Sequence, residues 1–301
     1  MIDFRSLQDI IGQAEAAGKP ISALVLTQTA LDMEISEEAV LARMHENLNV
    51  MREAVAQGAE KDVKSVSGLT GGMAHKVKAR ALSGAALPGP LLAEIIYSAL
   101  AVAELNACMG KIVAAPTAGS CGILPACLLT LQNMHNLTDE AVVAGLLTAS
   151  AVGMVIARNA TLAGAEGGCQ AECGSAAAMA AAAMVEVMGG TPSMCGHAAA
   201  QALKSLMGLV CDPVAGLVEE PCIVRNPSSA GIALVAAELS LAGVESLIPV
   251  DEVIATMGQV GKQMPESLRE TAEGGVAICK TGRRLAAEVA ARAGSGALPR
   301  A

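Results

Sequence analysis

Three cysteines in this sequence have the surroundings of metal ligands. Cys169 lies in the turn GGCQAECG, and Cys211 and Cys222 lie in the segment GLVCDPVAGLVEEPCIVRN, each with glycine or proline nearby. Thiolates in stiff turns suit zinc and iron-sulfur sites, but C-x3-C followed far downstream by C-x10-C matches no familiar zinc or ferredoxin spacing. The spacing alone therefore leaves a metal site and reactive or merely buried thiols as open alternatives.

A metal held by these three thiols would do chemistry rather than only support the fold. Structural sites close their coordination shell, whereas catalytic sites keep one position open for water or substrate. No obvious fourth ligand accompanies Cys169, Cys211 and Cys222. An iron-sulfur cluster bound by three cysteines would leave one iron as a Lewis acid.

The other cysteines outside these turns are expected to fill space in the core. Cys108 and Cys127 lie in apolar helical patterns, and Cys195 and Cys279 are assigned the same role, with Cys279 in a more open turn. Nine cysteines are an odd number, and the first residues, MIDFRSLQDIIGQ, lack the pattern of a secretory signal. The chain is therefore expected to be cytoplasmic, with reduced thiols.

The elements that position these residues are predicted to be helices. The 301 residues are 53% hydrophobic, with no Trp, one Tyr and one Phe, and such small side chains favour close helix packing over a β-sandwich. The segment SALVLTQT at 22–29 is the best strand candidate and is ambiguous, so the predicted fold class is all-α, with apolar Ala/Gly-rich core helices. Capping patterns predict helix starts at Ser6, Ser36, Thr138, Pro192 with Ser193, and Ser228 or Ser229.

Five glycine-rich turns interrupt the predicted helices. Glycine lets a backbone approach a ligand closely, so these turns are the expected binding segments. No internal repeat or long linker is evident, which predicts one domain over 1–301, with the more charged residues 1–65 as a candidate peripheral helical layer. The turns are SGLTGGMAHK (67–76), AAPTAGSCGILPA (114–126), LAGAEGGCQAECGSAA (162–177), GLVCDPVAGLVEEPC (208–222) and ETAEGGVAICKTG (270–282).

Charge and hydropathy argue against two classes of partner. The formal net charge is −9 and no Lys/Arg run occurs, so the electrostatic footprint of a nucleic-acid-binding protein is missing. The uncharged run at 141–157 is rich in Gly, Ala, Ser and Thr and falls short of the roughly 20 apolar residues that span a bilayer. It is expected to be a buried core helix, and a small molecule or a protein is the expected partner.

Several long motifs make the sequence resemble one enzyme family, the alpha subunit of the iron-sulfur-dependent L-serine dehydratases (L-serine ammonia-lyases). The resemblance covers almost the whole chain, and the motifs are too long and uncommon to be shared by chance. They are SGLTGGMAHK, LPGPLL at 87–92, NACMGKIVAAPTAGSCGILPA from 106, NATLAGAEGGCQAECGSAAAMAAAA from 159, GGTP at 189–192, GLVCDPVAGLVEEPCIVRN, and MPESLRETAEGGVA from 264.

The resemblance implies a 4Fe-4S cluster bound by Cys169, Cys211 and Cys222, with the fourth iron left for substrate. It also implies conversion of L-serine to pyruvate and ammonia, in which iron assists departure of the poor hydroxyl leaving group and a base takes the weakly acidic α-proton. Electron withdrawal by iron replaces a Schiff base, so no pyridoxal phosphate is expected. Cys173 departs from the family, in which valine is common there, and is expected to be a bystander.

The segment PTAGSCG is the first candidate for holding the amino acid. The hydroxyls of Thr117 and Ser120, with the flexible backbone at Gly119, could bind the substrate carboxylate. In the alternative interpretation, Thr117 and Ser120 simply cap a helix that starts near Gly122.

Further candidates flank the cysteine turns. Lys76, after TGG, could add a cation to the substrate site or belong to a solvated face. Asn159 and Glu172 flank Cys169, where either could orient substrate or support the cluster. Arg225 and Asn226, just after Cys222, are expected to hydrogen-bond the cluster sulfurs or the loop.

The catalytic base is not identified on this chain. Its histidines lie outside the Ser-Ser-His-Thr context that marks a proposed catalytic histidine of the family, a motif of the beta subunit, so a separate beta chain is the expected partner. Two alternatives stay open: a non-catalytic iron-sulfur oxygen sensor or scaffold, or a dehydratase or desulfidase for a related β-substituted amino acid such as threonine or cysteine. The four histidines are His45, His75, His135 and His197.

Overall fold

A computed structural model describes residues 5–294 of the chain. Within this range it consists of helices and connecting turns, with no β-strand and one isolated bridge between Cys211 and Arg269, which confirms the all-α prediction. The α-helices are α1 (Leu7–Ala17), α2 (Ile21–Asp32), α3 (Glu37–Gly58), α4 (Met73–Leu82), α5 (Gly89–Ala107), α6 (Ile123–His135), α7 (Asp139–Asn159), α8 (Gly164–Gly167), α9 (Ser175–Val187), α10 (Pro192–Leu206), α11 (Cys222–Leu241), α12 (Val250–Gln263) and α13 (Lys280–Gly294).

Local capping starts several helices where the sequence predicts. The side chains of Ser6, Ser36 and Thr138 each accept a hydrogen bond from the backbone N–H three residues later, at the starts of α1, α3 and α7. These bonds satisfy N–H groups that have no partner within the helix. α10 starts at Pro192 as predicted, with Thr191 rather than Ser193 as its capping side chain.

One ambiguous segment proves to be helical, and one expected helix start is wrong. Residues 22–29 form most of α2, which packs against α7 and α3 and buries Ile21 and Val25. α11 does not start at Ser228 or Ser229 but six or seven residues earlier, at Cys222, and Pro227 lies inside it. A proline costs a helix one internal N–H bond, and here the surrounding packing outweighs that local cost.

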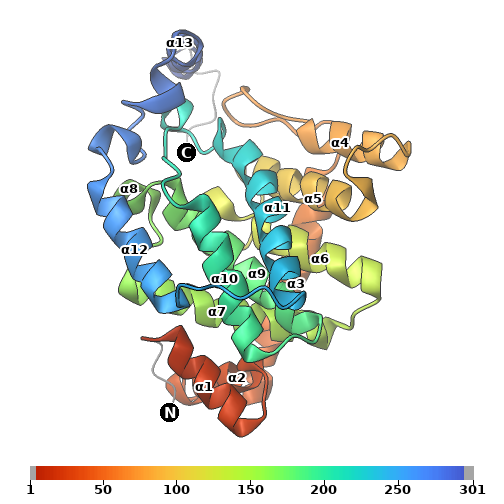
Figure 1. Cartoon of the computed structure of the whole chain (residues 1–301). Helices are drawn as coiled ribbons and strands as arrows, with labels where there is room; N and C mark the ends of the chain where they lie inside the picture. Colours follow the sequence, from red (N-terminus) through yellow and green to blue (C-terminus); the bar gives the residue numbers. More distant parts are fainter. Residues whose placement is uncertain (1–4, 295–301) are drawn as a thin grey trace.

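The core is centred on α9. All of its residues from Ser175 to Val185 are buried, and it packs against α7, α10, α11 and α6, which surround it in the middle of the molecule (Figure 1). Its sequence SAAAMAAAAMVEV offers mostly methyl groups, so the neighbouring helices approach its backbone closely. The same buried core includes Leu7, Val25 and Leu48 from the first three helices.

Two of the described helices, α5 and α7, are long and apolar enough to cross a membrane by length and composition. More than half of each lies inside the protein, and α7 packs directly on α9, as expected for the core helix predicted at 141–157.

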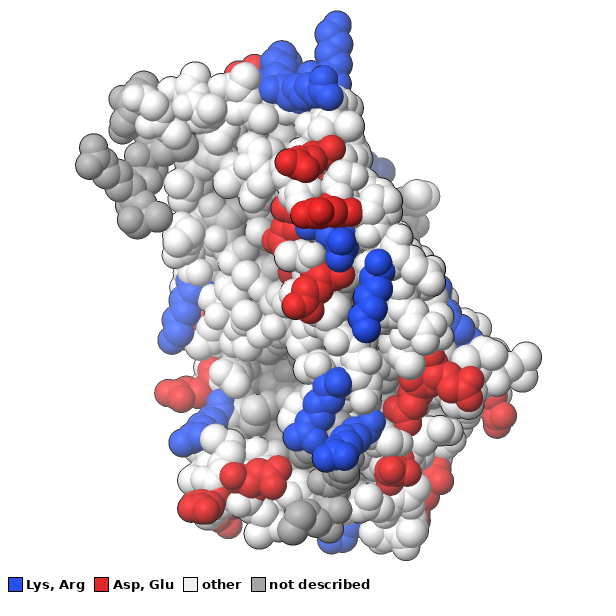
Figure 2. All heavy atoms as spheres, turned by 90° about the vertical axis from the view of Figure 1, so that its left-hand side faces the viewer, with Lys and Arg blue, Asp and Glu red and all other residues white. Residues whose placement is uncertain are grey.

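On the face that carries α12 and α13, basic and acidic side chains are interspersed and lie beside broad uncharged areas (Figure 2).

Candidate functional site

The three cysteines singled out above lie on three different segments and are all buried. Cys169 precedes a short π-helical turn at Gln170–Gly174, Cys211 lies in the extended segment after α10, and Cys222 is the first residue of α11. Their exposed fractions are 2%, 2% and 6%. Burial, with the nearby thiols of Cys169 and Cys222, raises the pKa of Cys211, so the three sulfurs share one electrostatic environment.

Cys211 is held by a segment that lies far away in the sequence. Its backbone N–H donates to the carbonyl of Leu268 at 2.8 Å, and its carbonyl accepts from the N–H of Glu270 at 2.8 Å. These two bonds form the isolated bridge between Cys211 and Arg269. They bring the glycine-rich turn that starts at residue 270 to the cysteines.

Arg225 joins the two halves of the loop between Cys211 and Cys222. Its guanidinium donates to the carbonyl of Val210 at 2.9 Å and to Oδ1 of Asp212 at 2.8 Å, and this ion pair is almost fully buried. The other carboxylate oxygen of Asp212 accepts the N–H of Val276 at 2.7 Å. Arg225 therefore binds the loop, as expected, and places a positive charge near the thiols.

Asn226 connects the cysteine loop to the PTAGSCG segment. Its amide oxygen accepts the N–H of Gly122 at 2.9 Å, and its amide nitrogen donates to the carbonyls of Gly119 at 2.9 Å and Cys222 at 3.0 Å. Asn226 is buried, with all these bonds made inside the protein. It thereby sets the position of residues 119–122 relative to the first turn of α11.

Cys173 lies against Cys169, with the two sulfur atoms 3.4 Å apart. Contact with the Cys173 thiol, helped by the charge of Arg225, lowers the pKa of Cys169, while the same contact and burial raise the pKa of Cys173. The two thiols are therefore in direct contact, and Cys173 lies beside the proposed ligand Cys169.

The three thiols are donors of the type that an iron-sulfur cluster uses. Among residues 5–294 the structure shows no preformed group of His, Cys, Asp or Glu side chains around a single metal ion. In an iron-sulfur cluster each thiolate binds a different iron, so the thiolates are spread around the cluster. Three buried soft donors on separate segments, with a guanidinium beside them, fit such a group.

Glu172 is the acidic side chain at the centre of the site. It is largely buried, its Oε1 accepts the hydroxyl of Thr117 at 2.7 Å, and it acts on the pKa values of Cys211 and Cys222. Burial raises the pKa of Glu172, and the nearby carboxylate of Glu270 raises it further. Glu172 links the PTAGSCG segment to the cysteines, as its flanking position had suggested.

Thr117, Gly119 and Ser120 lie together at this point. The hydroxyl oxygens of Thr117 and Ser120 are 3.1 Å apart, and Ser120 is fully buried. They do not cap α6, because its N-cap is Gly122 and neither hydroxyl accepts an N–H of its first turn. The capping interpretation is therefore wrong: the hydroxyl of Thr117 bonds Glu172, and that of Ser120 contacts Thr117.

These features match a known family over most of the chain. Residues 16–277 match the family profile described as serine dehydratase alpha chain. The chain belongs to this family. It is 46% identical to the probable L-serine dehydratase alpha chain of Bacillus subtilis (strain 168) over 94% of both chains, and 44% identical to the L-serine dehydratase alpha chain of Peptoniphilus asaccharolyticus over 92% of this chain and 95% of that one.

Some relatives of this serine dehydratase alpha chain are longer proteins. L-serine dehydratase TdcG of Escherichia coli (strain K12) is 36% identical over 92% of this chain, which covers 62% of that protein. Relatives named L-serine dehydratase are lyases, so the enzyme class inferred from the motifs is confirmed. The rest of that longer protein is not matched by this chain.

Two predicted substrate residues lie apart from this group. Lys76 is exposed on α4, which packs against α5. Asn159 is exposed at the end of α7, where its amide donates to the carbonyl of Arg5 at 2.6 Å. Among the described residues no hydrogen bond or ion pair joins either side chain to Glu172 or the cysteines, and their role in substrate binding stays a prediction.

The remaining cysteines mostly behave as predicted. Cys127 and Cys195 are fully buried in α6 and α10, where burial raises the pKa of Cys127 to about 12. Cys108 is half-buried at the end of α5, and its thiol donates a hydrogen bond to the carbonyl oxygen of Lys64 at 2.9 Å. Cys279 is exposed rather than core, because it lies outside α13 in the turn that precedes it.

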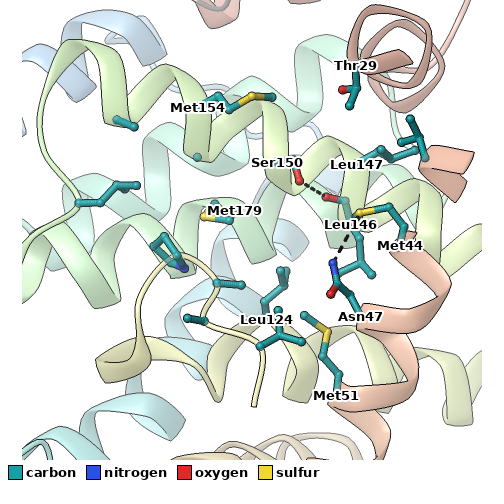
Figure 3. A pocket seen from close by; sticks show the side chains of 18 residues that line it. Thr29, Met44, Asn47, Met51, Leu124, Leu146, Leu147, Ser150, Met154 and Met179 are labelled. Atoms are coloured by element: carbon teal, nitrogen blue, oxygen red, sulfur yellow. Dashed lines mark hydrogen bonds between the residues drawn. The ribbon is translucent and has the colours of Figure 1, made fainter. Parts of the chain in front are cut away.

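A cavity of about 430 Å³ lies between α2, α3, α6, α7 and α9 (Figure 3). Leu and Met side chains dominate its walls, among them Met44, Leu147 and Met179, and no charged side chain lines it. Such a lining does not suit an amino acid, which carries two charges at neutral pH. The cavity reaches the candidate site only at Pro116, next to Thr117, so the cysteine region is the better substrate site.

One functional residue, Glu270, was missed by the sequence interpretation. The only signal was its place at the start of the glycine-rich turn 270–282, which was singled out for its glycines rather than its carboxylate. Its backbone adopts a positive φ of 65°. That conformation is uncommon outside glycine and marks a residue held by its surroundings.

Proposed function

We propose that this chain is the alpha subunit of an L-serine dehydratase that converts L-serine to pyruvate and ammonia. The observation that carries the proposal is that Cys169, Cys211 and Cys222 are buried and influence one another's pKa, with Glu172 between Cys211 and the hydroxyl of Thr117. Family membership and the names of the relatives support the same reaction.

In this proposal the three cysteines hold a 4Fe-4S cluster, and no pyridoxal phosphate takes part. When bound, the cluster supplies a Lewis acid at the one iron that has no cysteine ligand. Burial raises the pKa of Cys222 to about 12, so the thiols must lose protons as the cluster binds, and the nearby Arg225 favours their anionic form.

The chain's own residues prepare the site for a small polar substrate. Arg225 and Asn226 bind the loops that carry Cys211, Cys222 and Gly119, so little rearrangement is needed on binding. Ser120 and the backbone around Gly119 offer donors for the substrate carboxylate, and Thr117, whose hydroxyl donates to Glu172, holds the Glu172 carboxylate beside them. The buried surroundings keep bulk water away and strengthen each of these contacts.

The alpha chain is proposed to work with a separate beta chain that supplies the catalytic base. The description of its relatives as alpha chains supports a second chain, and so does the extra length of relatives such as the E. coli enzyme. L-serine would then bind between the two chains. Mixing purified alpha and beta chains should raise pyruvate release far above that of alpha alone, and no gain would contradict the partnership.

The proposed function is tested by anaerobic reconstitution with iron and sulfide. The protein has no Trp and one Tyr, so a visible cluster absorption is easily distinguished from the protein's own spectrum. Pyruvate release from L-serine is then measured with the beta chain present. An active but colourless and iron-free enzyme would refute the cluster.

Paired substitutions identify the ligands. Cys211→Ala and Cys222→Ala should each lose both visible absorption and turnover, because each removes one of three ligands. Cys108→Ala is the control, since Cys108 bonds only the carbonyl of Lys64 outside the site and should retain both. Equal behaviour of Cys108→Ala and Cys211→Ala would contradict the assignment.

A further inference from the structure

Two glycines make room for the carboxylate of Glu172. A β-carbon at Gly119 would lie 3.0 Å from Oε1, and a β-carbon at Gly164 would lie 2.6 Å from Oε2. Either distance is shorter than normal packing allows, so the two backbones approach the carboxylate because they carry no side chain. Glu172 is thus enclosed on both sides, with Oε1 bonded to Thr117 and Oε2 directed toward Gly164.

A second carboxylate and a thiol meet Glu172 at Gly164. The same β-carbon position at Gly164 lies 3.1 Å from Oε2 of Glu270 and 3.2 Å from Sγ of Cys211. Glu270 is kept there by the bond from its N–H to the carbonyl of Cys211. Two carboxylate oxygens from distant segments therefore lie close together, next to one of the proposed cluster ligands.

The neighbouring cations of the chain are bonded elsewhere. Arg225 donates to Val210 and Asp212, and Arg269 donates to the carbonyl of Glu166 at 3.4 Å. Two carboxylates close together in a buried place repel each other, and the repulsion is relieved when one takes up a proton or when a cation lies between them. Holding Thr117 requires only one oxygen of Glu172, so that bond does not explain why a second carboxylate is placed beside it.

We propose that Glu172, assisted by Glu270, binds the α-ammonium group of the substrate, an inference that rests on the proposed function. An α-amino acid supplies the one cation that the pair lacks. The ammonium would lie next to Cys211, with the substrate carboxylate near Thr117 and Ser120 on the other side of Glu172. The pair would then select α-amino acids against hydroxy acids of the same size, a discrimination that hydrogen bonding to a buried charge achieves well.

The test compares two ligands that differ only in the ammonium group. For wild type and for Glu172→Gln, the affinity of the reconstituted alpha-beta enzyme is measured anaerobically as the KM for pyruvate release from L-serine and as the inhibition constant of 3-hydroxypropanoate against it. Where no pyruvate forms, titration calorimetry measures the binding of both ligands instead. The variant keeps an acceptor for Thr117 but removes the charge. Loss of a charge-assisted hydrogen bond should weaken L-serine binding by about 10- to 100-fold, while 3-hydroxypropanoate changes by less than about twofold.

A matched control is available in Glu37, at the start of α3 and outside the cysteine loop. Like Glu172 it accepts a threonine hydroxyl at 2.7 Å, in its case from Thr27. Glu37→Gln should leave both affinities unchanged. If Glu172→Gln does not fold, Glu270→Gln replaces it in the test, because Glu270 is only half-buried. This variant should weaken the binding of L-serine, by a smaller factor than expected for Glu172→Gln, and leave the binding of 3-hydroxypropanoate unchanged.

Two results would overturn the inference. One is an unchanged affinity of Glu172→Gln for L-serine, and the other is an equal loss for both ligands, which indicates a collapsed loop rather than a lost charge. Pyruvate release tests the proposed function separately. Wild-type enzyme that binds L-serine selectively over 3-hydroxypropanoate without forming pyruvate would refute the reaction and support the ammonium site.

Discussion

Replacing Arg225 by methionine should strongly destabilise the chain. Arg225 makes two hydrogen bonds, to Val210 and to Asp212, and the side chains of the ion pair are only 16% and 3% exposed. Methionine retains much of the apolar bulk but leaves the Asp212 carboxylate buried with the N–H of Val276 as its remaining partner. Breaking a buried ion pair from one side costs about 3–5 kcal/mol of unfolding free energy.

That loss is large compared with the total stability of a typical domain, about 5–15 kcal/mol. Urea unfolding of the alpha chain, followed by circular dichroism at 222 nm, measures it directly, because α-helices are the main regular structure of the described residues. The measurement is made without iron, so that no bound cluster contributes to stability. The midpoint should fall while the slope of the transition stays unchanged.

The control is a second arginine pair on the surface. Arg284 and Glu288 lie one turn apart on α13 with side chains 61% and 41% exposed. Arg284→Met should cost less than about 0.5 kcal/mol, as exposed helix pairs do. If Arg225→Met costs no more than Arg284→Met, the buried ion pair does not support the cysteine loop as described.

Two further predictions concern acid stability and the extra thiol. Hydrogen bonds, first from Arg52 and then from Gln132, lower the pKa of the half-exposed Asp139 from 3.8 to about 2. A depressed carboxylate pKa adds stability above the unfolded value, and this contribution, less than about 1 kcal/mol here, is lost as the pH falls from about 4 to about 2. The melting temperature of Asp139→Asn should therefore fall less than that of wild type over this range, and equal falls would contradict the assignment. Cys173→Val should keep the iron content of the reconstituted protein, whereas Cys169→Ala should lose it, and iron loss in Cys173→Val would identify Cys173 as a ligand.

Helix starts were predictable from the sequence where one local bond decides them. Ser6, Ser36 and Thr138 each cap a helix through an N–H only three residues away, so no distant contact is involved. The segment 22–29 lacks such a signal, and its mixture of apolar and hydroxyl residues suits a strand as well as a helix. Packing of α2 against α3 and α7 decides that case.

The start of α11 shows how a local rule can mislead. Serine is a favoured N-cap residue, which placed the predicted start at Ser228 or Ser229. In the structure α11 continues through Pro227 back to Cys222, where Asn226 bonds both the first turn of the helix and Gly119. Cys222 is therefore positioned by the first turn of α11 and not by the turn that precedes a later helix start.

The sequence by itself determined the all-α class and the helix starts that are capped by Ser6, Ser36 and Thr138. It also identified the three cysteines that lie in glycine- and proline-containing turns. These features depend only on composition and on residues close in the sequence. Only the tertiary structure decided that Glu172 bonds Thr117, 55 positions away, and that Glu270 joins them through Cys211. Such contacts form only when several helices pack together around α9, and no short sequence pattern contains this information. The carboxylate pair beside the cysteines is therefore a property of the packed chain.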